Sequence, residues 1–117
     1  MNRPFDLEDR LVEYASSIIG FAESLPKTRA GLTLEDQIVR ASISSALNYG
    51  EVQGTRTDKD FTHKMGLVLK ELKETRVGLK IILSSKIGTQ SLANKIIQEC
   101  EELIAISATR IKNRNNK

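Results

Sequence analysis

The chain of 117 residues has few of the residues that interrupt or cross-link a fold. It contains no Trp, two Pro, seven Gly and one Cys. The single cysteine, Cys100, excludes an internal disulfide, and so little Pro and Gly predicts long elements. The five aromatic residues are few for a β-protein and few for a module that stacks unpaired bases. No window approaches 18 consecutive apolar residues, so we expect no membrane span and no membrane partner.

The remaining composition is typical of a folded globular protein. Apolar residues make up 39% of the chain and charged residues 28%, and this length fits one domain over residues 1–117. The first residues include Arg3, Asp6, Glu8 and Asp9, with no apolar run of the kind found in signal peptides. We therefore expect a cytoplasmic protein.

Apolar residues recur at intervals of three and four along four segments, the period of helices that bury one face. The predicted helices cover residues of about 5–24, 34–52, 58–84 and 91–112, followed by a frayed basic tail at 113–117. Asp6, Thr33 and Thr57 are the expected N-caps of the first three, and Thr89 or Ser91 begins the fourth. Because the connections are short, neighbouring helices must be antiparallel. The sequence predicts an all-α, antiparallel up-down-up-down four-helix bundle.

Three of the predicted helices carry more apolar residues than one buried stripe requires. The residues in excess are Val12, Ile19, Phe21, Leu67, Leu69, Ile81, Leu83, Ile97, Ile104 and Ile106. Exposed apolar patches mark interaction surfaces, although a broad core face with single exposed residues is the common alternative. We expect the chain to self-associate.

The second predicted helix carries a seam of polar residues along one side. Its members follow one another at intervals of three, four, four and three: Gln37, Arg40, Ser44, Asn48 and Glu51. Such a seam beside an apolar one indicates that it faces another helix. Buried charges need partners, so we expect Arg40 to pair with Glu71 or Glu74 of the antiparallel third helix. This predicts a structural polar network that sets helix register rather than a ligand site.

At this seam, and at residues 58–75, the chain resembles the four-helix-bundle proteins of the 23S rRNA intervening-sequence family. The five seam residues match the family pattern one by one, Val52 stands where a glycine is usual, and Asp60-Phe61, Lys70-Glu71 and Glu74-Thr75 continue the match. The resemblance implies a bundle that assembles as a ring-like homopentamer. A related bundle is an accessory protein of diversity-generating retroelements, in which a basic pentamer binds nucleic acid and a reverse transcriptase. For this family, no biochemical role is established.

The charge of the chain is unevenly distributed. Residues 1–58 carry 6 Lys+Arg and 9 Asp+Glu, a net −3, whereas residues 59–117 carry 12 and 6, a net +6. The basic half is a candidate surface for RNA or DNA, since lysines contact phosphates without reading bases. The candidate contacts are Lys59, Lys70, Lys73, Lys80, Arg110, Lys112, Arg114 and Lys117. A solvated charged face is the alternative explanation.

The sequence offers little for catalysis. A di-iron bundle needs two Glu-x-x-His pairs, and His63, in Asp60-x-x-His63, is the one histidine. Cys100 falls on the apolar seam of the fourth helix, the position of a buried small residue rather than of a nucleophile. We expect no cofactor, no metal and no enzymatic activity. Two hypotheses remain: a nucleic-acid-binding accessory protein, or a protein-binding adaptor that uses the excess apolar surface.

Overall fold

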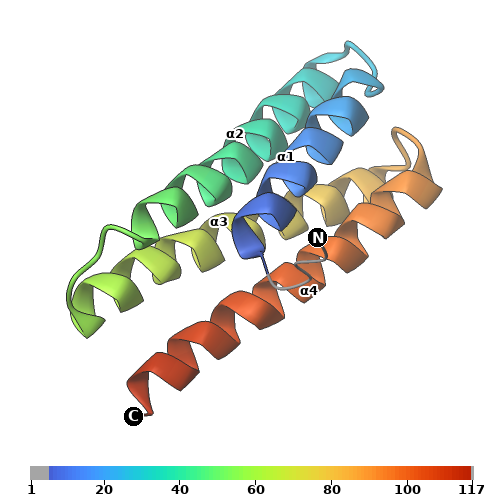
Figure 1. Cartoon of the computed structure of the whole chain (residues 1–117). Helices are drawn as coiled ribbons and strands as arrows, with labels where there is room; N and C mark the ends of the chain where they lie inside the picture. Colours follow the sequence, from blue (N-terminus) through green and yellow to red (C-terminus); the bar gives the residue numbers. More distant parts are fainter. Residues whose placement is uncertain (1–5, 117) are drawn as a thin grey trace.

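The computed structural model describes residues 6–116 and forms four helices there (Figure 1). They are α1 (Leu7–Glu23), α2 (Arg29–Val52), α3 (Asp58–Ser85) and α4 (Gln90–Asn115). Successive helices run in opposite directions and pack against one another, and α4 also contacts α1. The all-α class and the up-down arrangement are therefore confirmed. None of the helices in the described part of the chain is long and apolar enough to cross a membrane.

Two helix starts agree with the expected caps and one does not. Asp6 accepts a hydrogen bond from the Asp9 amide at 3.2 Å, and Thr57 accepts one from the Asp60 amide at 3.0 Å. The prediction that α2 starts after Thr33 is wrong, because α2 begins at Arg29.

The true cap of α2 is Thr28, which accepts a hydrogen bond from the Gly31 amide at 3.1 Å. A Cβ at Gly31 would lie 1.9 Å from the Pro26 carbonyl oxygen. Because Gly31 has no side chain, the first turn of α2 can pack directly on the Pro26 carbonyl. The helix can therefore begin only three residues after the proline.

The predicted end of α4 is also wrong. The helix continues three residues beyond 112, to Asn115, so residues 113–115 are helical rather than frayed. The Thr62 hydroxyl of α3 donates a hydrogen bond to the Asn115 side-chain oxygen at 3.1 Å. Lys117, the last residue of the predicted tail, lies outside the described residues.

The core runs along the centre of the bundle and takes residues from all four helices. Phe21, expected as excess, is 1% exposed and belongs to this core, so that prediction is wrong. In α4, Leu92 is 38% exposed, whereas Ala93 is buried. Four other residues expected as excess pack partly against the core: Leu83, Ile97, Ile104 and Ile106. Val12, Ile19 and Ile81 are exposed, as expected.

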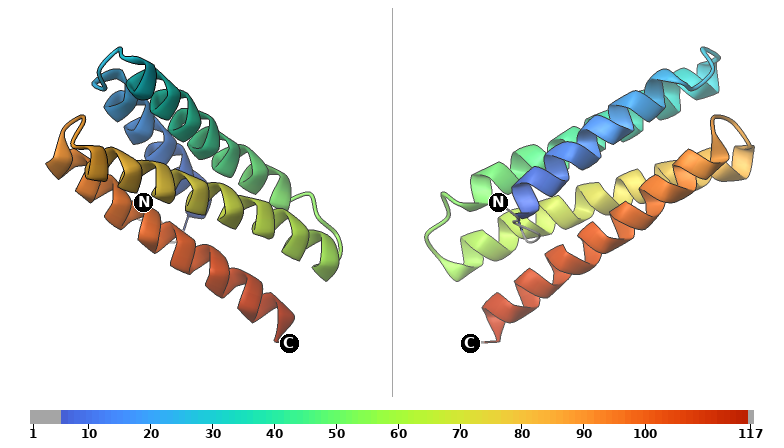
Figure 2. Two further views of the ribbon diagram at one scale, coloured as in Figure 1. Left: turned by 180° about the vertical axis from the view of Figure 1, so that it is seen from behind. Right: turned by 45° about the vertical axis from the view of Figure 1, so that its right-hand side comes forward.

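The two faces of the bundle differ in the helices they present. From behind, α2 and α3 come forward and α1 lies behind them (Figure 2). A Cβ at Gly78 of α3 would lie 2.7 Å from the Ile38 methyl carbon of α2, so glycine permits the close approach of these two helices. This α2–α3 side carries the hollows described next.

Candidate functional site

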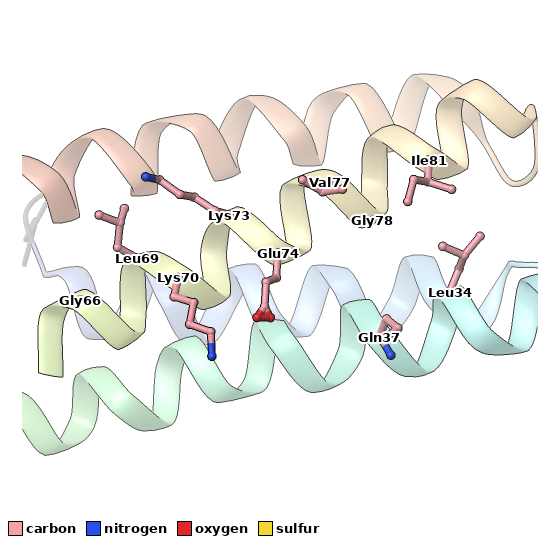
Figure 3. A pocket seen from close by; sticks show the side chains of 10 residues that line it. All are labelled: Leu34, Gln37, Gly66, Leu69, Lys70, Lys73, Glu74, Val77, Gly78 and Ile81. Atoms are coloured by element: carbon pink, nitrogen blue, oxygen red, sulfur yellow. The ribbon is translucent and has the colours of Figure 1, made fainter. Parts of the chain in front are cut away.

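A hollow of about 800 Å³ lies on the surface between α2 and α3 (Figure 3). We call it the α2–α3 groove. Its lining residues are Leu34, Gln37, Gly66, Leu69, Lys70, Lys73, Glu74, Val77, Gly78 and Ile81. The lining is mainly apolar, with four polar side chains among the ten residues. Such a composition favours the binding of a surface that is itself partly apolar.

The side of α3 that borders the groove carries exposed apolar residues beside its charged ones. Val77 is 53% exposed and Ile81 is 46% exposed. Across the groove, Leu34 of α2 points toward Ile81, while Lys70 and Glu74 reach toward α2 from the other half of α3 (Figure 3). Leu34, Val77 and Ile81 thus lie toward one end of the groove, and Leu69 lies among the charged side chains toward the other end (Figure 3).

The predicted polar network lies at the edge of this groove. Gln37, Arg40 and Ser44 of α2 and Lys70, Glu71 and Glu74 of α3 line an adjoining hollow, together with Ala41. The two hollows share Gln37, Lys70 and Glu74. Five of the seven residues of the predicted network thus line this hollow, whereas Asn48 and Glu51 do not, and the hollow is continuous with the groove.

The contacts within this group differ from those expected. Arg40 donates a hydrogen bond to Asp36 of its own helix at 3.4 Å, and the two side chains are 75% and 61% exposed. The predicted pairing of Arg40 with Glu71 or Glu74 is thus wrong. The reason is that Arg40 lies in solvent, where a charge needs no protein partner.

Elsewhere in the seam the contacts are local or lead to α3. The Asn48 side chain donates to the Ser44 carbonyl at 2.9 Å and to the Ser44 hydroxyl oxygen at 3.1 Å. Glu51 pairs with Lys64 of α3. The seam is therefore a half-exposed border of the α2–α3 surface with one ion pair between the helices, rather than a buried network.

The candidate nucleic-acid contacts separate into two groups. Lys59, Lys70, Lys73 and Lys80 of α3 are exposed, and within residues 6–116 none of them has an ion pair. These four lysines therefore project from the surface, unlike Lys64 of the same helix, which pairs with Glu51. Lys112 of α4 is exposed as well.

The two arginines near the end of α4 are instead held by neighbouring helices. Arg110 donates to the Tyr49 hydroxyl at 2.6 Å and lies 5.8 Å from the centre of that ring. Arg114 donates to Asp58 at 2.5 Å and lies 4.4 Å from the centre of the Phe61 ring. Arg110 thus joins α4 to α2, and Arg114 joins it to α3. These contacts explain why α4 does not fray where a tail was expected.

The groups capable of covalent or acid–base chemistry are placed unfavourably for it. Cys100 is buried and its thiol donates to the Leu72 carbonyl at 3.2 Å. Burial raises the pKa of the Cys100 thiol and of the Tyr14 hydroxyl. His63 is exposed, and no group of three metal-ligating side chains occurs in the part of the chain that the structure describes.

Four antiparallel helices around one apolar core define the class of the protein, an all-α up-down helical bundle. Residues 6–109 match the family model of the 23S rRNA-intervening sequence protein, and the chain belongs to this family. The family resemblance given by the seam residues is thereby confirmed.

A solved structure has the same fold. It is a protein with unknown function from the S23 ribosomal protein family of Bacteroides thetaiotaomicron. The two chains are 24% identical, the match covers 91% of this chain and 98% of that one, and the TM-score is 0.83. The comparison with curated proteins gave no match.

The sequence reasoning missed part of the groove. Leu34, Gly66, Val77 and Gly78 line it, and none of them was predicted as part of a surface. A signal was present, because Val77 follows Lys73 by four residues and precedes Lys80 by three, so it lies on the same side of α3 as these two candidate contacts. The prediction considered only the lysines on this side of α3 and so missed Val77.

Proposed function

We propose that this protein is a non-catalytic, self-assembling four-helix bundle in which another copy of the chain covers the α2–α3 groove. One observation carries the proposal: Val77 and Ile81 stay about half exposed inside a hollow lined mainly by apolar side chains. Removing such surface from water is favourable, by about 25 cal/mol per Å² of apolar area. Another copy of the chain is always available to cover this surface, because it is present wherever the protein is.

Assembly as a ring-like homopentamer is part of the proposal. It is what the family resemblance implies, and the exposed apolar side chains support it: Val12, Ile19, Leu32, Ile43, Leu47, Val77, Ile81 and Leu92. These residues lie on all four helices, which suits a chain that meets more than one neighbour. We also propose a cytoplasmic location, with which the buried free thiol of Cys100 is consistent.

The absence of catalysis is supported by the state of the reactive groups. The Cys100 thiol and the Tyr14 hydroxyl are buried in the core, and their raised pKa values keep both protonated at neutral pH. A nucleophile or general base needs to be accessible to a substrate and to lose its proton near the working pH.

The test replaces the exposed apolar residues of the groove. We expect Val77→Glu combined with Ile81→Glu to convert an oligomer into a monomer of about 13.0 kDa, measured by size exclusion with light scattering. The matched control, Ile43→Glu with Leu47→Glu, makes the same change at exposed positions of α2 outside the groove lining and should keep the wild-type mass. Circular dichroism should show the same helix content in all three proteins.

A wild-type protein that is monomeric at about 0.1 mM would refute the proposal, as would a groove variant of unchanged mass. In the first case the protein-binding adaptor hypothesis would explain the exposed groove instead, with a different protein as its occupant.

A second candidate function is nucleic-acid binding, which the exposed lysines of α3 favour. Lys59, Lys70, Lys73 and Lys80 have no ion pair within the described residues, and a ring would repeat them around its circumference. Lys112 and Lys117 are further candidate contacts, whereas the interactions that Arg110 and Arg114 already make weaken their case.

Salt dependence tests this second function. A protein that contacts several phosphates should lose at least tenfold in affinity for duplex DNA or structured RNA between about 50 and 200 mM salt. Replacing Lys59 and Lys80 by Gln, which leaves the groove lining intact, should reduce the slope of this dependence by about one for each lysine that binds a phosphate. No binding at about 50 mM salt would exclude the function.

A further inference from the structure

The outer face of α1 carries an apolar stripe with acidic ends. Its members follow one another at intervals of four, four, three and four: Glu8, Val12, Ser16, Ile19 and Glu23. All five are exposed, Val12 to 51% and Ile19 to 44%. We call these five residues the α1 stripe. It contains no basic residue, because the one arginine of α1 is turned toward α4.

That arginine is Arg10, which binds two carboxylates of α4. Its guanidinium donates to Glu99 at 2.8 Å and to Glu102 at 3.0 Å, and the hydrogen bond to Glu99 raises the pKa of Arg10. This basic group is therefore directed sideways between α1 and α4, and the α1 stripe is left apolar in the middle and negative at both ends.

The α2–α3 groove has the complementary chemistry. It offers Leu69, Val77 and Ile81 as apolar surface, and its charged side chains are Lys70, Lys73 and Glu74, a net charge of +1. Val12 and Ile19 are seven residues apart, about 10 Å along a helix. The apolar side chains of the groove extend over twelve residues of α3, about 18 Å. The two apolar positions of the stripe therefore fit within the length of the groove.

Resting on the self-assembly proposed above, we propose that the α1 stripe of one copy occupies the α2–α3 groove of the next copy. Val12 and Ile19 lie on the apolar side chains of the groove, and one acidic end of the stripe lies near Lys70 and Lys73. Complementary charge fixes the orientation of such a contact more than its strength.

The alternative of two grooves facing each other fits the charges less well. Such a contact would pair two surfaces that each carry a net positive charge from Lys70, Lys73 and Glu74, and like charges in an interface are unfavourable. The α1 stripe and the groove also lie on different sides of the bundle, since α1 is behind when α2 and α3 face the viewer (Figure 2). The contact is therefore heterologous, and repeating it gives a closed ring when the rotation between copies closes.

A mixing experiment tests this arrangement. The α1 variant is Val12→Glu with Ile19→Glu, and the groove variant is Val77→Glu with Ile81→Glu. Each variant alone should be a monomer of 13.0 kDa. Their equimolar mixture should form a heterodimer of twice that mass, because one intact stripe and one intact groove remain. The measurement is light scattering in about 150 mM salt, and Ile43→Glu with Leu47→Glu is the control that should keep the wild-type mass.

Other outcomes separate this inference from the function beneath it. An α1 variant of wild-type mass beside a monomeric groove variant would show that the groove is an interface for another segment, so the inference would fail and self-assembly would stand. Monomeric variants that do not combine would show that the contact is not heterologous, which also overturns the inference. If both variants kept the wild-type mass, the inference and the proposed function would fail together.

Discussion

The end of α4 and the middle of α3 are both basic, but their side chains have different surroundings. At the end of α4, Arg110 and Arg114 each combine a hydrogen bond with an aromatic ring of another helix. In the middle of α3, Lys70 and Lys73 border an open groove and have no ion pair among residues 6–116. The positive charges at the end of α4 therefore stabilise the bundle, whereas those in the middle of α3 are available to a partner.

The difference follows from the two side chains. A guanidinium is planar, weakly hydrated and able to stack on a ring while it donates hydrogen bonds, whereas an ammonium is compact and strongly hydrated. Arginine next to Tyr49 or Phe61 thus gains from leaving water, and lysine on an open helix face does not. The predictions below test this contrast in order of decreasing effect on stability.

The largest effect is expected at the end of α4. Arg110→Ala with Arg114→Ala should lower the free energy of unfolding by about 2 kcal/mol, since each change removes a hydrogen bond and a ring interaction worth about 1 kcal/mol together. The figure allows for partial exposure, the Arg114 and Asp58 side chains being 28% and 62% exposed. Urea denaturation at one fixed protein concentration measures it.

Lys112→Ala is the matched control for this experiment, because Lys112 lies between the two arginines and is exposed. It should change stability by less than about 0.5 kcal/mol. Equal effects of the control and the double variant would mean that the arginines contribute no more than a solvated charge.

The stability of the bundle at alkaline pH depends on a core residue, Tyr14, and not on the arginine contacts. The Tyr14 hydroxyl is buried near Cys100 and Thr75 and makes no hydrogen bond of normal geometry within the part of the chain that the structure describes, and burial raises its pKa. The folded state then keeps its proton while the unfolded state loses it above pH of about 10, so stability falls as pH rises beyond that value, by up to about 1.4 kcal/mol per pH unit. Arginine stays charged throughout this range.

Tyr14→Phe should therefore raise stability by up to about 1 kcal/mol at pH of about 7 and reduce the decline in stability between about pH 10 and 11. Thermal or urea unfolding of both proteins across this pH range measures the difference. The same alkaline slope in both would show that Tyr14 is not the group responsible.

The ion pair within the α4 contacts is expected to be weak by itself. A double-mutant cycle with Asp58→Asn and Arg114→Gln should give a coupling energy of about 0.5 kcal/mol. The cycle is needed because Asp58 also lies in the first turn of α3, where a negative charge is favourable. A coupling above about 2 kcal/mol would indicate that the pair, rather than the ring, is the main contribution of Arg114.

The smallest effect on stability is expected in the groove. Lys70→Gln with Lys73→Gln should change the free energy of unfolding by less than about 0.5 kcal/mol. If one acidic end of the α1 stripe lies near these lysines, the same variant should assemble several-fold more weakly at about 50 mM salt, with the difference fading at about 500 mM as charges are screened. A clear decrease in stability would mean that Lys70 and Lys73 stabilise the bundle as Arg110 and Arg114 do, which would contradict the contrast between the two regions.

The helices were predictable because their signals are local. Asp6 and Thr57 were correctly identified as caps, since capping depends on a side chain and an amide three residues away. The start of α2 was missed because Thr28 follows so closely on Pro26, and Thr33 offered an equally good local signal. The choice between them depends on how the first turn packs on the proline carbonyl.

The candidate site was predictable only in part. Helical spacing correctly brought Gln37, Arg40 and Ser44 to one side of α2, near Glu71 and Glu74 of α3. It could not show how far that side is from the core, and so the burial of Arg40 and its pairing were predicted wrongly. Exposure depends on how each helix is rotated relative to its neighbours, and the sequence of one helix does not determine this rotation.

The sequence by itself determined the number of helices, most of their buried faces and the family, because the period of apolar residues and the pattern of the polar seam lie within single segments. Only the tertiary structure decided that Arg110 and Arg114 are held by aromatic rings, that Phe21 is in the core, and that Val77 and Ile81 border an open groove with Lys70. These outcomes depend on side chains from helices far apart in the chain. Their meeting is set by the packing of four helices around one core, where small differences in helix rotation decide which side chain leaves water.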